Sequence, residues 1–486
     1  MRKLLIILSV IITCFCLSAC EITLGALPNE SSSSGRKTVS RSYVASSSSQ
    51  ISVVEKSSEK QSAEKSKENS VITSEITESS RSEKPIEVSS VASKSESSKS
   101  QSSKSESSKS ESSKSQSSKS ESLKSESSKS QSSASSSETI TLNYDARVDA
   151  TFSGSNGSLV GGVKTYKTVG DALNAIGSAS DKVIYIESGL YKEKLTISKP
   201  KNLTLIGSSS GETKLTYGDC STMAGGTNQS ASITVLSEGF TAINIHFENS
   251  YDYLNGSEKD KQAVAFHINA DRGTFYNCKF TGHQDTLLVN TGRHYMKNCV
   301  ISGSVDFIFG NNPSVLFESC NVVSRNRNAS NGGYITAMKG NDGTNGSGVA
   351  TYGLVFNDCS FTAESGVKSG SVALGRPWRA DATVTFMNSE IGSHISTKAY
   401  SNDKSSGCRY VYMSGGGVKN HPQNAYFTEY NNTGAGAISS AVNGCKMLTK
   451  SQAEKYTMAN IFAKTNGAVN YSTAFDPLSV LAKFIK

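Results

Sequence analysis

The chain has 486 residues, a formal net charge of +8 and 36% hydrophobic residues. This length is enough for one large folded core, and so mild a charge balance suits a polyanionic partner without indicating nucleic-acid binding. The ten cysteines include no C-x-x-C spacing, so they predict neither a metal site nor a redox site.

The first twenty residues have the features of an export signal. A positive start, Arg2 and Lys3, precedes an apolar run at 4–17 that is too short to span a bilayer comfortably. The run ends in LSAC at 17–20, which resembles a bacterial lipobox in which Cys20 becomes the lipidated first residue of the mature chain. An ordinary signal peptide followed by a chance cysteine is the alternative. Both interpretations predict export, and the first predicts a lipid anchor in the membrane at the cell surface.

Residues 21–138 are dominated by Ser, Lys, Glu and Gln, and 93–133 repeat Ser-Lys-Ser-Glu/Gln-Ser every five residues. This period fits neither a helix nor a strand, and a segment with so few apolar residues cannot offset its ordering entropy by burial. We therefore expect a disordered linker. Its lysines and glutamates nearly cancel, which favours a solvated tether over a nucleic-acid or membrane patch. As a flexible coil it reaches roughly 60 Å, enough to hold a domain at 139–486 clear of a membrane.

A four-residue pattern recurs through 139–486: a short polar residue, a small core-type residue, a variable residue and an apolar one. It begins at residues 202, 244, 277, 298, 319, 358 and 388. The smallest step is 21 residues, and longer steps leave room for inserted loops. Such a repeat predicts an all-β parallel β-helix, with one coil for each repeat.

The chemistry of the repeat supports this fold. Alternation places the second and fourth residues on one inward face, so four cysteines are expected to stack in the core as small hydrophobes: Cys278, Cys299, Cys320 and Cys359. The polar first residues are expected in left-handed turns. Whether Cys408 and Cys445 form a disulfide stays open.

Two short helical stretches are expected to cover the β-helix. Residues 168–176 carry apolar residues at helical spacing with Gly177 after them, which predicts an amphipathic N-terminal cap. A second helical stretch is predicted at 449–463, where it would cover part of another side.

Two aspartates stand out because they are separated by one coil. Asp285 and Asp306 lie 21 residues apart, so they are expected to be neighbours on adjacent turns. Two close carboxylates cannot both ionise cheaply, so one holds a proton while the other acts as a nucleophile. Arg376, from a later coil, is placed to hold one of them as the anion.

Three further residues suggest how a substrate could be bound near the two aspartates. Gln262 and Gln284 carry amide N–H donors that can meet an oxyanion. Trp378, the only tryptophan, offers an apolar surface for a sugar ring. Taken alone, each such residue is more often structural; an isolated aspartate in a β-helix is usually a turn-former.

The motifs that contain these residues occur in a fixed order. They are GLYKE at 189–193, QAVA at 262–265, GHQDTL at 282–287, DFIFG at 306–310, LGRPW at 374–378, and EY at 429–430 followed by NTGAGA at 432–437. Together they closely resemble the pectin methylesterase (pectinesterase) family, and the resemblance covers nearly all of 155–486.

The resemblance implies a right-handed parallel β-helix that hydrolyses methyl esters of pectin or a related polyuronate. It implies that Asp306 is the nucleophile, that Asp285 is the acid and base, and that Arg376 orients Asp306. Gln262 and Gln284 would stabilise the oxyanion. Trp378 would line the substrate cleft, and Thr227 aligns with a threonine that contacts substrate. We expect a monomer with no cofactor, no metal and no nucleic-acid partner.

Other interpretations stay open. The segment GSSSG at 207–211 fits the serine-hydrolase pattern G-x-S-x-G, but a second strand rather than a helix is expected after it. The family often has a second tryptophan in the region equivalent to 410–426, which here contains Met413 and none. A related esterase or thioesterase, a non-catalytic β-helix adhesin, and a lyase or glycosidase of the same fold are therefore the alternatives.

Overall fold

The computed structural model describes residues 143–330, 332–340, 352–401, 407–414, 420–467 and 469–485. The predicted export signal at 1–20 and the predicted tether at 21–138 lie outside these residues. Everything below concerns the described part of the domain.

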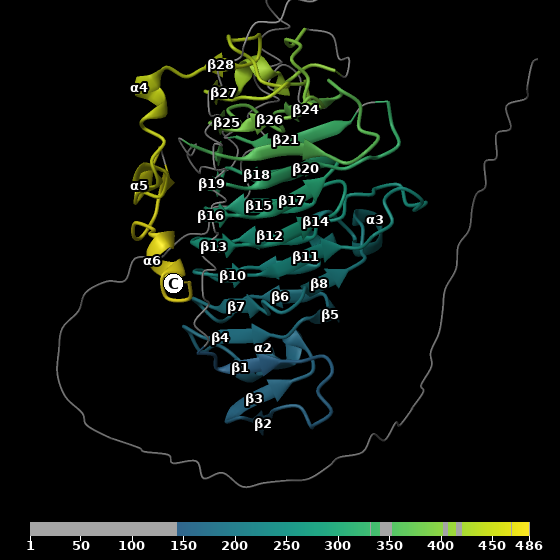
Figure 1. Cartoon of the computed structure of the whole chain (residues 1–486), viewed down its shortest axis with the longest axis vertical. Helices are drawn as coiled ribbons and strands as arrows, with labels where there is room; N and C mark the ends of the chain where they lie inside the picture. Colours follow the sequence, from purple (N-terminus) through teal and green to yellow (C-terminus); the bar gives the residue numbers. More distant parts are fainter. Residues whose placement is uncertain are drawn as a thin grey trace, which may run out of the picture. The chain divides into compact units, whose positions relative to one another are not determined.

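Strands of the domain form three long sheets whose members follow one another coil by coil (Figure 1). The 13-stranded sheet contains, in spatial order, β2 (Ser158–Val160), β3 (Val163–Tyr166), β1 (Ala146–Val148), β4 (Val183–Ile186), β7 (Thr204–Gly207), β10 (Thr241–Ile243), β13 (Gly273–Tyr276), β16 (Arg293–Lys297), β19 (Ser314–Glu318), β22 (Leu354–Asn357), β25 (Thr383–Met387), β27 (Tyr426–Tyr430) and β28 (Lys446–Met447).

The other two long sheets complete each coil. The 8-stranded sheet contains β26 (Glu390–Ile391), β23 (Ser360–Ala363), β20 (Asn321–Ser324), β17 (Val300–Gly303), β14 (Lys279–Thr281), β11 (Ile245–Asn249), β8 (Thr213–Tyr217) and β5 (Gly189–Lys192). The 7-stranded sheet contains β24 (Val372–Gly375), β21 (Gly333–Lys339), β18 (Val305–Asn311), β15 (Leu287–Thr291), β12 (Phe266–Asn269), β9 (Ile233–Val235) and β6 (Leu195–Ile197).

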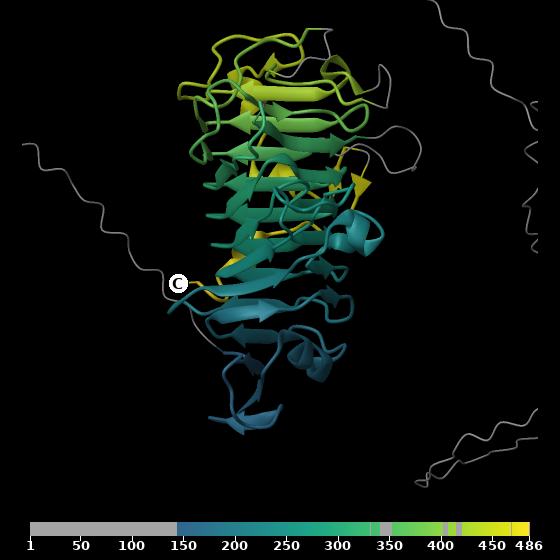
Figure 2. The same ribbon diagram turned by 90° about the vertical axis from the view of Figure 1, so that its right-hand side faces the viewer.

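Pairing within these sheets is parallel from coil to coil, as for β13 with β16 and β15 with β18. The short hairpin β2–β3 at one end of the stack is antiparallel, as is the separate pair β29 (Thr465–Asn466) and β30 (Val469–Asn470). Successive coils stack along one axis, which is plain when the domain is turned by 90° (Figure 2). The prediction of a right-handed parallel β-helix is confirmed.

The turn after each strand of the 13-stranded sheet explains most of the sequence repeat. Seven aligned turn residues have φ between 48° and 58°: Asn244, Asn277, Asn298, Ser319, Asp358, Asn388 and Asn431. Asparagine tolerates this left-handed conformation, and its amide can also bond to the equivalent residue of the next coil. The Asn277 Nδ2 atom donates to Asn244 Oδ1 at 2.7 Å, for example.

The segment that begins at residue 202 is out of register with the other six repeats, because it lies at the start of a strand and not at the end of one. Thr204 pairs with Thr241, so Asn202 aligns with Gly239 at the start of the strand, whereas Asn244 follows its end. Asn202 also has a positive φ, and its amide donates to Asp181. Both ends of the strand need a left-handed residue, so the same local pattern arises at either end.

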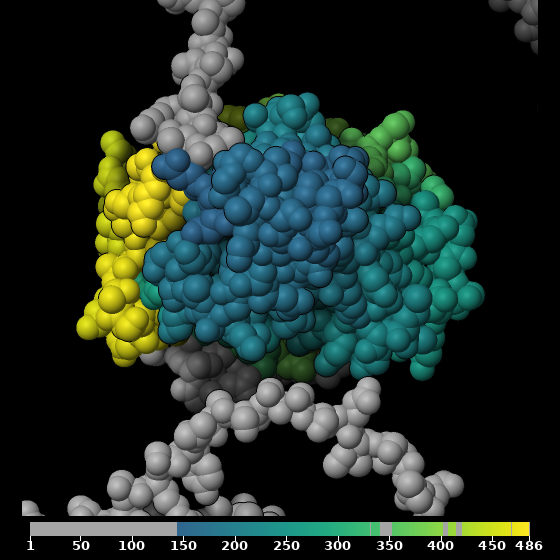
Figure 3. Space-filling model, turned by 90° about the horizontal axis from the view of Figure 1, so that it is seen from below, coloured from purple at the N-terminus to yellow at the C-terminus, as the bar shows by residue number. Residues whose placement is uncertain are grey.

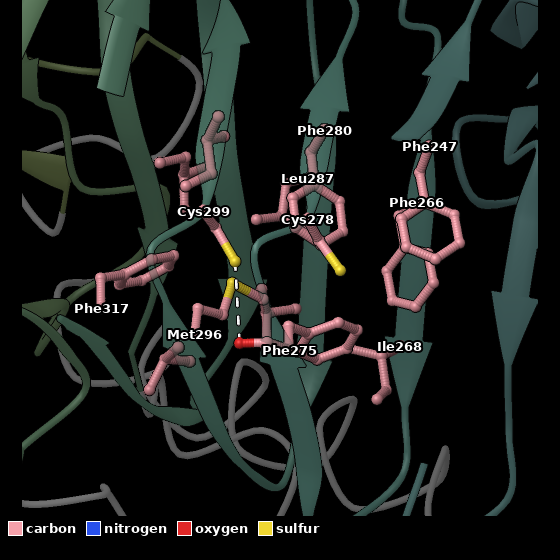
Figure 4. Close-up of a cluster of buried hydrophobic side chains, with 14 of the residues drawn as sticks. Phe247, Phe266, Ile268, Phe275, Cys278, Phe280, Leu287, Met296, Cys299 and Phe317 are labelled. Carbon is pink, nitrogen blue, oxygen red and sulfur yellow. Dashed lines mark hydrogen bonds between the residues drawn. The ribbon is translucent and has the colours of Figure 1, made fainter. Parts of the chain in front are cut away.

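The core lies inside the three sheets and consists of stacked apolar side chains. Cys278, Cys299, Cys320 and Cys359 are all buried there, next to aromatic stacks such as Phe317–Phe356, whose ring centroids are 4.4 Å apart. The Cys299 thiol donates to the Phe275 carbonyl at 3.7 Å (Figure 4). The predicted cysteine stack therefore exists. Cys408 and Cys445, whose pairing was open, are both free thiols.

Helix α2 (Val169–Ile176) forms as predicted at one end of the stack. The Thr168 side chain accepts from Asp171 N, and Gly177 ends the helix with φ 61°. Val169 and Ala172 are buried in the main core. The short helices α3 (Ser221–Ala224), η1 (Asn228–Ser230) and η3 (Pro422–Asn424) lie in loops between strands.

The prediction of a single helical stretch at 449–463 is wrong in one respect. Two short helices occur there, α4 (Lys450–Ala453) and α5 (Met458–Ile461), because Thr457 caps a new helix at Asn460 N. With α6 (Pro477–Leu481) they follow the outer face of the 13-stranded sheet back along the stack, shown in yellow in Figures 1 and 3. Ile461 and Phe462 pack there against Tyr295 and Leu316.

Candidate active site

The segment at 207–211 is not a serine-hydrolase elbow. It follows β7 and leads into strand β8, as the sequence predicted, and an elbow requires a helix at that point. The site suggested by the aspartates lies elsewhere, where the 8-stranded sheet turns into the 7-stranded one.

Asp285 and Asp306 occupy equivalent positions of two successive coils. Gln284 and Val305 form a parallel bridge, and Asp285 N donates to Val305 O at 2.9 Å. Both aspartates have positive φ, 63° for Asp285 and 50° for Asp306. This left-handed conformation is one that aspartate tolerates better than most residues. The predicted one-coil separation therefore brings the two residues side by side.

Arg376 follows β24 and reaches Asp306 from a later coil. Its Nε and Nη2 atoms donate to the two carboxylate oxygens of Asp306 at 2.7 and 2.5 Å, a two-pronged contact. The guanidinium carbon also lies 4.1 Å from the centroid of the Tyr334 ring. Burial alone would lower the pKa of Arg376, but the hydrogen bonds to Asp306 outweigh it and raise that pKa. A permanent cation is thus fixed on Asp306 by two hydrogen bonds, which also orient its carboxyl group.

Asp285 is in the opposite electrostatic situation. Burial, followed by the neighbouring Asp306 carboxylate, raises the pKa of Asp285 well above its ordinary value, and Arg376 opposes this only in part. Asp285 therefore keeps its proton to a higher pH than an ordinary aspartate does. The sequence predicted a held proton on one of the pair from carboxylate repulsion, and the roles of acid and nucleophile stay predictions.

A cleft of about 460 Å³ opens over these residues. It is lined by Thr227, Asn228, Gln262, Gln284, Asp285, Asp306, Phe309, Ala337, Arg376, Trp378, Met413 and Ser414. Every catalytic and substrate-binding residue predicted from the sequence is in this set, including Thr227. Their joint placement is a fact of the fold, while the role of each remains a prediction.

The two glutamines reach the cleft from neighbouring coils that are tied together by the backbone. Ala263 N donates to Gln284 O at 3.0 Å, and Gln262 O accepts from Ser221 N at 2.7 Å. The side-chain Oε1 of Gln262 is buried and has no hydrogen-bond partner among the described residues. A buried acceptor without a partner is costly, so this oxygen is available to a hydrogen-bond donor of a bound molecule.

An apolar wall completes the cleft beside Arg376. Trp378 packs with Phe309, Ala337 and Met413, and the Trp378 and Phe309 ring centroids are 6.4 Å apart. The sequence analysis missed Phe309, Ala337 and Met413 as lining residues. Phe309 belongs to a recognised motif, but a register shift between Val305 and Ile308 breaks the alternation that would have assigned its direction.

His246, His267 and His283 are not among the residues that line the cleft. His246 Nδ1 lies 2.9 Å from Glu212 Oε1, and its Nε2 lies 2.7 Å from Thr281 Oγ1. The His283 ring stacks on Tyr253 with centroids 5.0 Å apart. Burial lowers the pKa of His267 and of His283 to about 4. They are structural side chains of the coils and loops around the cleft.

No group of three or more His, Cys, Asp or Glu side chains in the described part of the chain has an arrangement that could hold a metal ion. In the same residues, no helix has both the length and the apolar character that a membrane crossing needs.

Comparisons with known proteins agree with the geometry. A family model described as Pectinesterase matches residues 159–466. "Probable pectinesterase A" of Aspergillus niger is 38% identical over 290 residues, covering 58% of this chain and 79% of that protein. "Pectin methylesterase PemA from Erwinia chrysanthemi" has a TM-score of 0.55 and 30% identity, over 68% of this chain and 100% of that one. "Pectin methylesterase from Carrot" has a TM-score of 0.55 and 28% identity, over 67% and 95%. The chain therefore belongs to the pectinesterase family.

Proposed function

We propose that this chain hydrolyses methyl esters of pectin, or of a closely related polyuronate, to free carboxylates and methanol, with Asp306 as nucleophile and Asp285 as acid and base. The observation that carries the proposal is the pair of aspartates on successive coils, one bound by Arg376 through two hydrogen bonds and the other buried beside it. A binding protein would not need this asymmetry, which argues against the adhesin alternative.

In the first half of the reaction, the Asp306 carboxylate attacks the ester carbonyl carbon. The carbonyl electron pair moves to its oxygen, and the N–H groups of Gln262 and Gln284 stabilise the resulting oxyanion. The tetrahedral intermediate then collapses with cleavage of the bond to the methoxy oxygen. That oxygen takes the proton of Asp285, so methanol leaves and the uronate acyl group remains on Asp306.

In the second half, Asp285 acts as a base. Its carboxylate takes a proton from a water molecule whose oxygen attacks the acyl carbon. The bond to Asp306 breaks, which regenerates the Asp306 carboxylate beside Arg376 and returns Asp285 to its protonated form. The product acid loses its proton to solvent. The cycle consumes one water and needs neither a metal nor a cofactor.

Cleft composition supports a sugar polymer as the substrate. Trp378 and Phe309 present apolar ring surface, and Thr227 and Asn228 present polar groups from the other lining segment. Saccharide rings combine apolar faces with hydroxyl edges, so both kinds of surface are expected in their binding sites. Met413 packs near Trp378, and the region 410–426 lacks the second tryptophan that the family resemblance implies, so the preference for neighbouring sugars is expected to differ from that of relatives.

The proposal extends to location. The LSAC sequence at 17–20 supports lipidation of Cys20 after export, and the 118 residues of low complexity that follow support a tether between membrane and enzyme. The domain would then act as a monomer at the cell surface on polymer outside the membrane.

Methanol release from highly methylated pectin tests the activity. Residues 21–486 are compared with Asp306→Asn and with a matched control, Asp358→Asn. Asparagine suits the left-handed backbone of both sites, so both variants are expected to fold. We expect activity to be lost in Asp306→Asn and retained in Asp358→Asn. No methanol from the folded wild-type chain, with turnover of small acyl esters or thioesters instead, would favour the related-esterase alternative.

A further inference from the structure

A buried ion pair near the catalytic arginine has no role in the chemistry above. Arg409 and Glu429 are both 0% exposed, and the Arg409 Nε and Nη2 atoms donate to the two Glu429 oxygens at 2.6 and 2.7 Å. Taking two charges out of water is expensive, and apolar side chains of similar size often serve stability equally well. Stability alone therefore does not explain why two charged side chains are buried here.

The remaining polar atoms of the pair bind several separate segments. The Arg409 Nη1 atom donates to Ser396 O at 3.0 Å and to Gly436 O at 2.6 Å. Glu429 also accepts from the Tyr410 hydroxyl at 3.0 Å and from Asn432 Nδ2 at 3.1 Å. One fully bonded network thus fixes these segments relative to β27, which carries Glu429.

Two of these segments cover the open edge of β24, the last strand of the 7-stranded sheet. At one end of β24, Ser396 N donates to Val372 O at 2.9 Å. At the other end, Leu374 N donates to Arg409 O at 2.8 Å and Val411 N donates to Gly375 O at 3.1 Å. Arg409 therefore holds both covering segments, one through its backbone and the other through its side chain.

Strand β24 ends immediately before Arg376, whose own N–H bonds to Thr336 O at 3.0 Å. The position of Arg376 is consequently set by β21 on one side and by the segment at 409–411 on the other. The chain then continues to Met413 and Ser414 in the cleft. We propose that Arg409 and Glu429 are positioning residues, which hold the edge of β24 so that Arg376 keeps its two-pronged contact with Asp306.

This inference rests on the proposed function, because it assigns the pair a role in that reaction. Loosening β24 would let Arg376 move away from Asp306, so the two hydrogen bonds that orient the Asp306 carboxylate would be weakened. The loss should appear in kcat, with KM little changed, because the contact orients a reacting group. A substitution that only lowers stability leaves both constants of the folded enzyme unchanged.

The test compares Glu429→Gln with a control at the other fully buried arginine of similar design. Arg293 is also 0% exposed and donates to both oxygens of Asp271, but it anchors the segment at 462–463 on the outer face of the 13-stranded sheet. Arg293→Met is therefore the control. Each variant is assayed for methanol release over a range of pectin concentrations, at a temperature where circular dichroism shows it to be folded.

We expect Glu429→Gln to lower kcat by about tenfold or more, as small displacements of catalytic groups do, with KM little changed. Arg293→Met should lower Tm and leave kcat unchanged. Should Glu429→Gln not fold, Tyr410→Phe removes one hydrogen bond to Glu429 while keeping the ring that stacks on Phe427, and a smaller decrease in kcat is expected.

An unchanged kcat in the folded variant, or the same decrease in Arg293→Met, would overturn the positioning role. A wild-type chain that releases no methanol would overturn the proposed function instead.

Discussion

Replacing Arg376 with lysine isolates the two-pronged contact with Asp306, because lysine keeps the positive charge but cannot present two parallel donors. In the wild type both carboxylate oxygens are bound, at 2.7 and 2.5 Å, and the two side chains are only 19% and 10% exposed. Lysine retains at most one such bond. A hydrogen bond to a charged group is worth about 1.5–3 kcal/mol, which corresponds to a loss of roughly 10- to 150-fold in kcat/KM if Asp306 is oriented chiefly through it.

The assay is methanol release over a range of pectin concentrations, so that kcat and KM are separated. Most of the loss should appear in kcat, because the contact orients a reacting group. Arg147→Lys is the matched control, since Arg147 also contacts carboxylates, those of Asp149 and Glu187, on the partly exposed surface at the far end of the stack. Activity of Arg376→Lys within twofold of wild type would refute the argument that the two-pronged geometry matters.

Two further predictions concern acid–base chemistry and the tether. Burial and Asp306 raise the pKa of Asp285, so the folded state binds the proton of this carboxyl group more tightly than the unfolded chain does. The stability that this proton contributes is fully present below about pH 3.9 and is lost as the pH rises through the raised pKa. Asp285→Asn cannot ionise, so it should have a higher Tm than wild type at neutral pH, an equal one near pH 3, and a greatly reduced kcat; a lower Tm at neutral pH would contradict the shift. Deleting 21–138 should leave kcat/KM on soluble pectin unchanged, and a loss of activity measured in solution would show that this segment does more than act as a spacer.

Much of the architecture could be predicted because a β-helix repeats one local requirement. A left-handed residue is needed at the end of each strand, and an apolar or small residue must follow it inward, so Asn277 or Cys299 carries the signal without any knowledge of distant contacts. The same repeat predicted that Asp285 and Asp306 are neighbours, because residues separated by the length of one coil lie side by side on adjacent turns. The error at Asn202 shows the limit, because a local pattern does not say which end of a strand it occupies.

The features that were not predicted depend on long-range pairing. Met413 reaches Trp378 through a loop whose path has no periodicity, and the direction of Phe309 is set by a register shift in β18. Arg409 and Glu429 lie 20 residues apart in the sequence. Glu429 belongs to a motif of the family resemblance, but nothing in the sequence pairs it with Arg409, so only the folded structure identifies the two as a buried ion pair.

The position of Asp285 and Asp306 on successive coils has a consequence for how the enzyme loses activity on heating. Strand-to-strand spacing in a β-sheet is fixed at roughly 4.7–4.9 Å by backbone hydrogen bonds. The distance between the backbones of Asp285 and Asp306 is therefore set by the stacking of their coils. This distance cannot change gradually while those hydrogen bonds hold. Heat should therefore leave the remaining active molecules fully active until the coils separate, and the temperature of half-inactivation should coincide with that of cooperative unfolding.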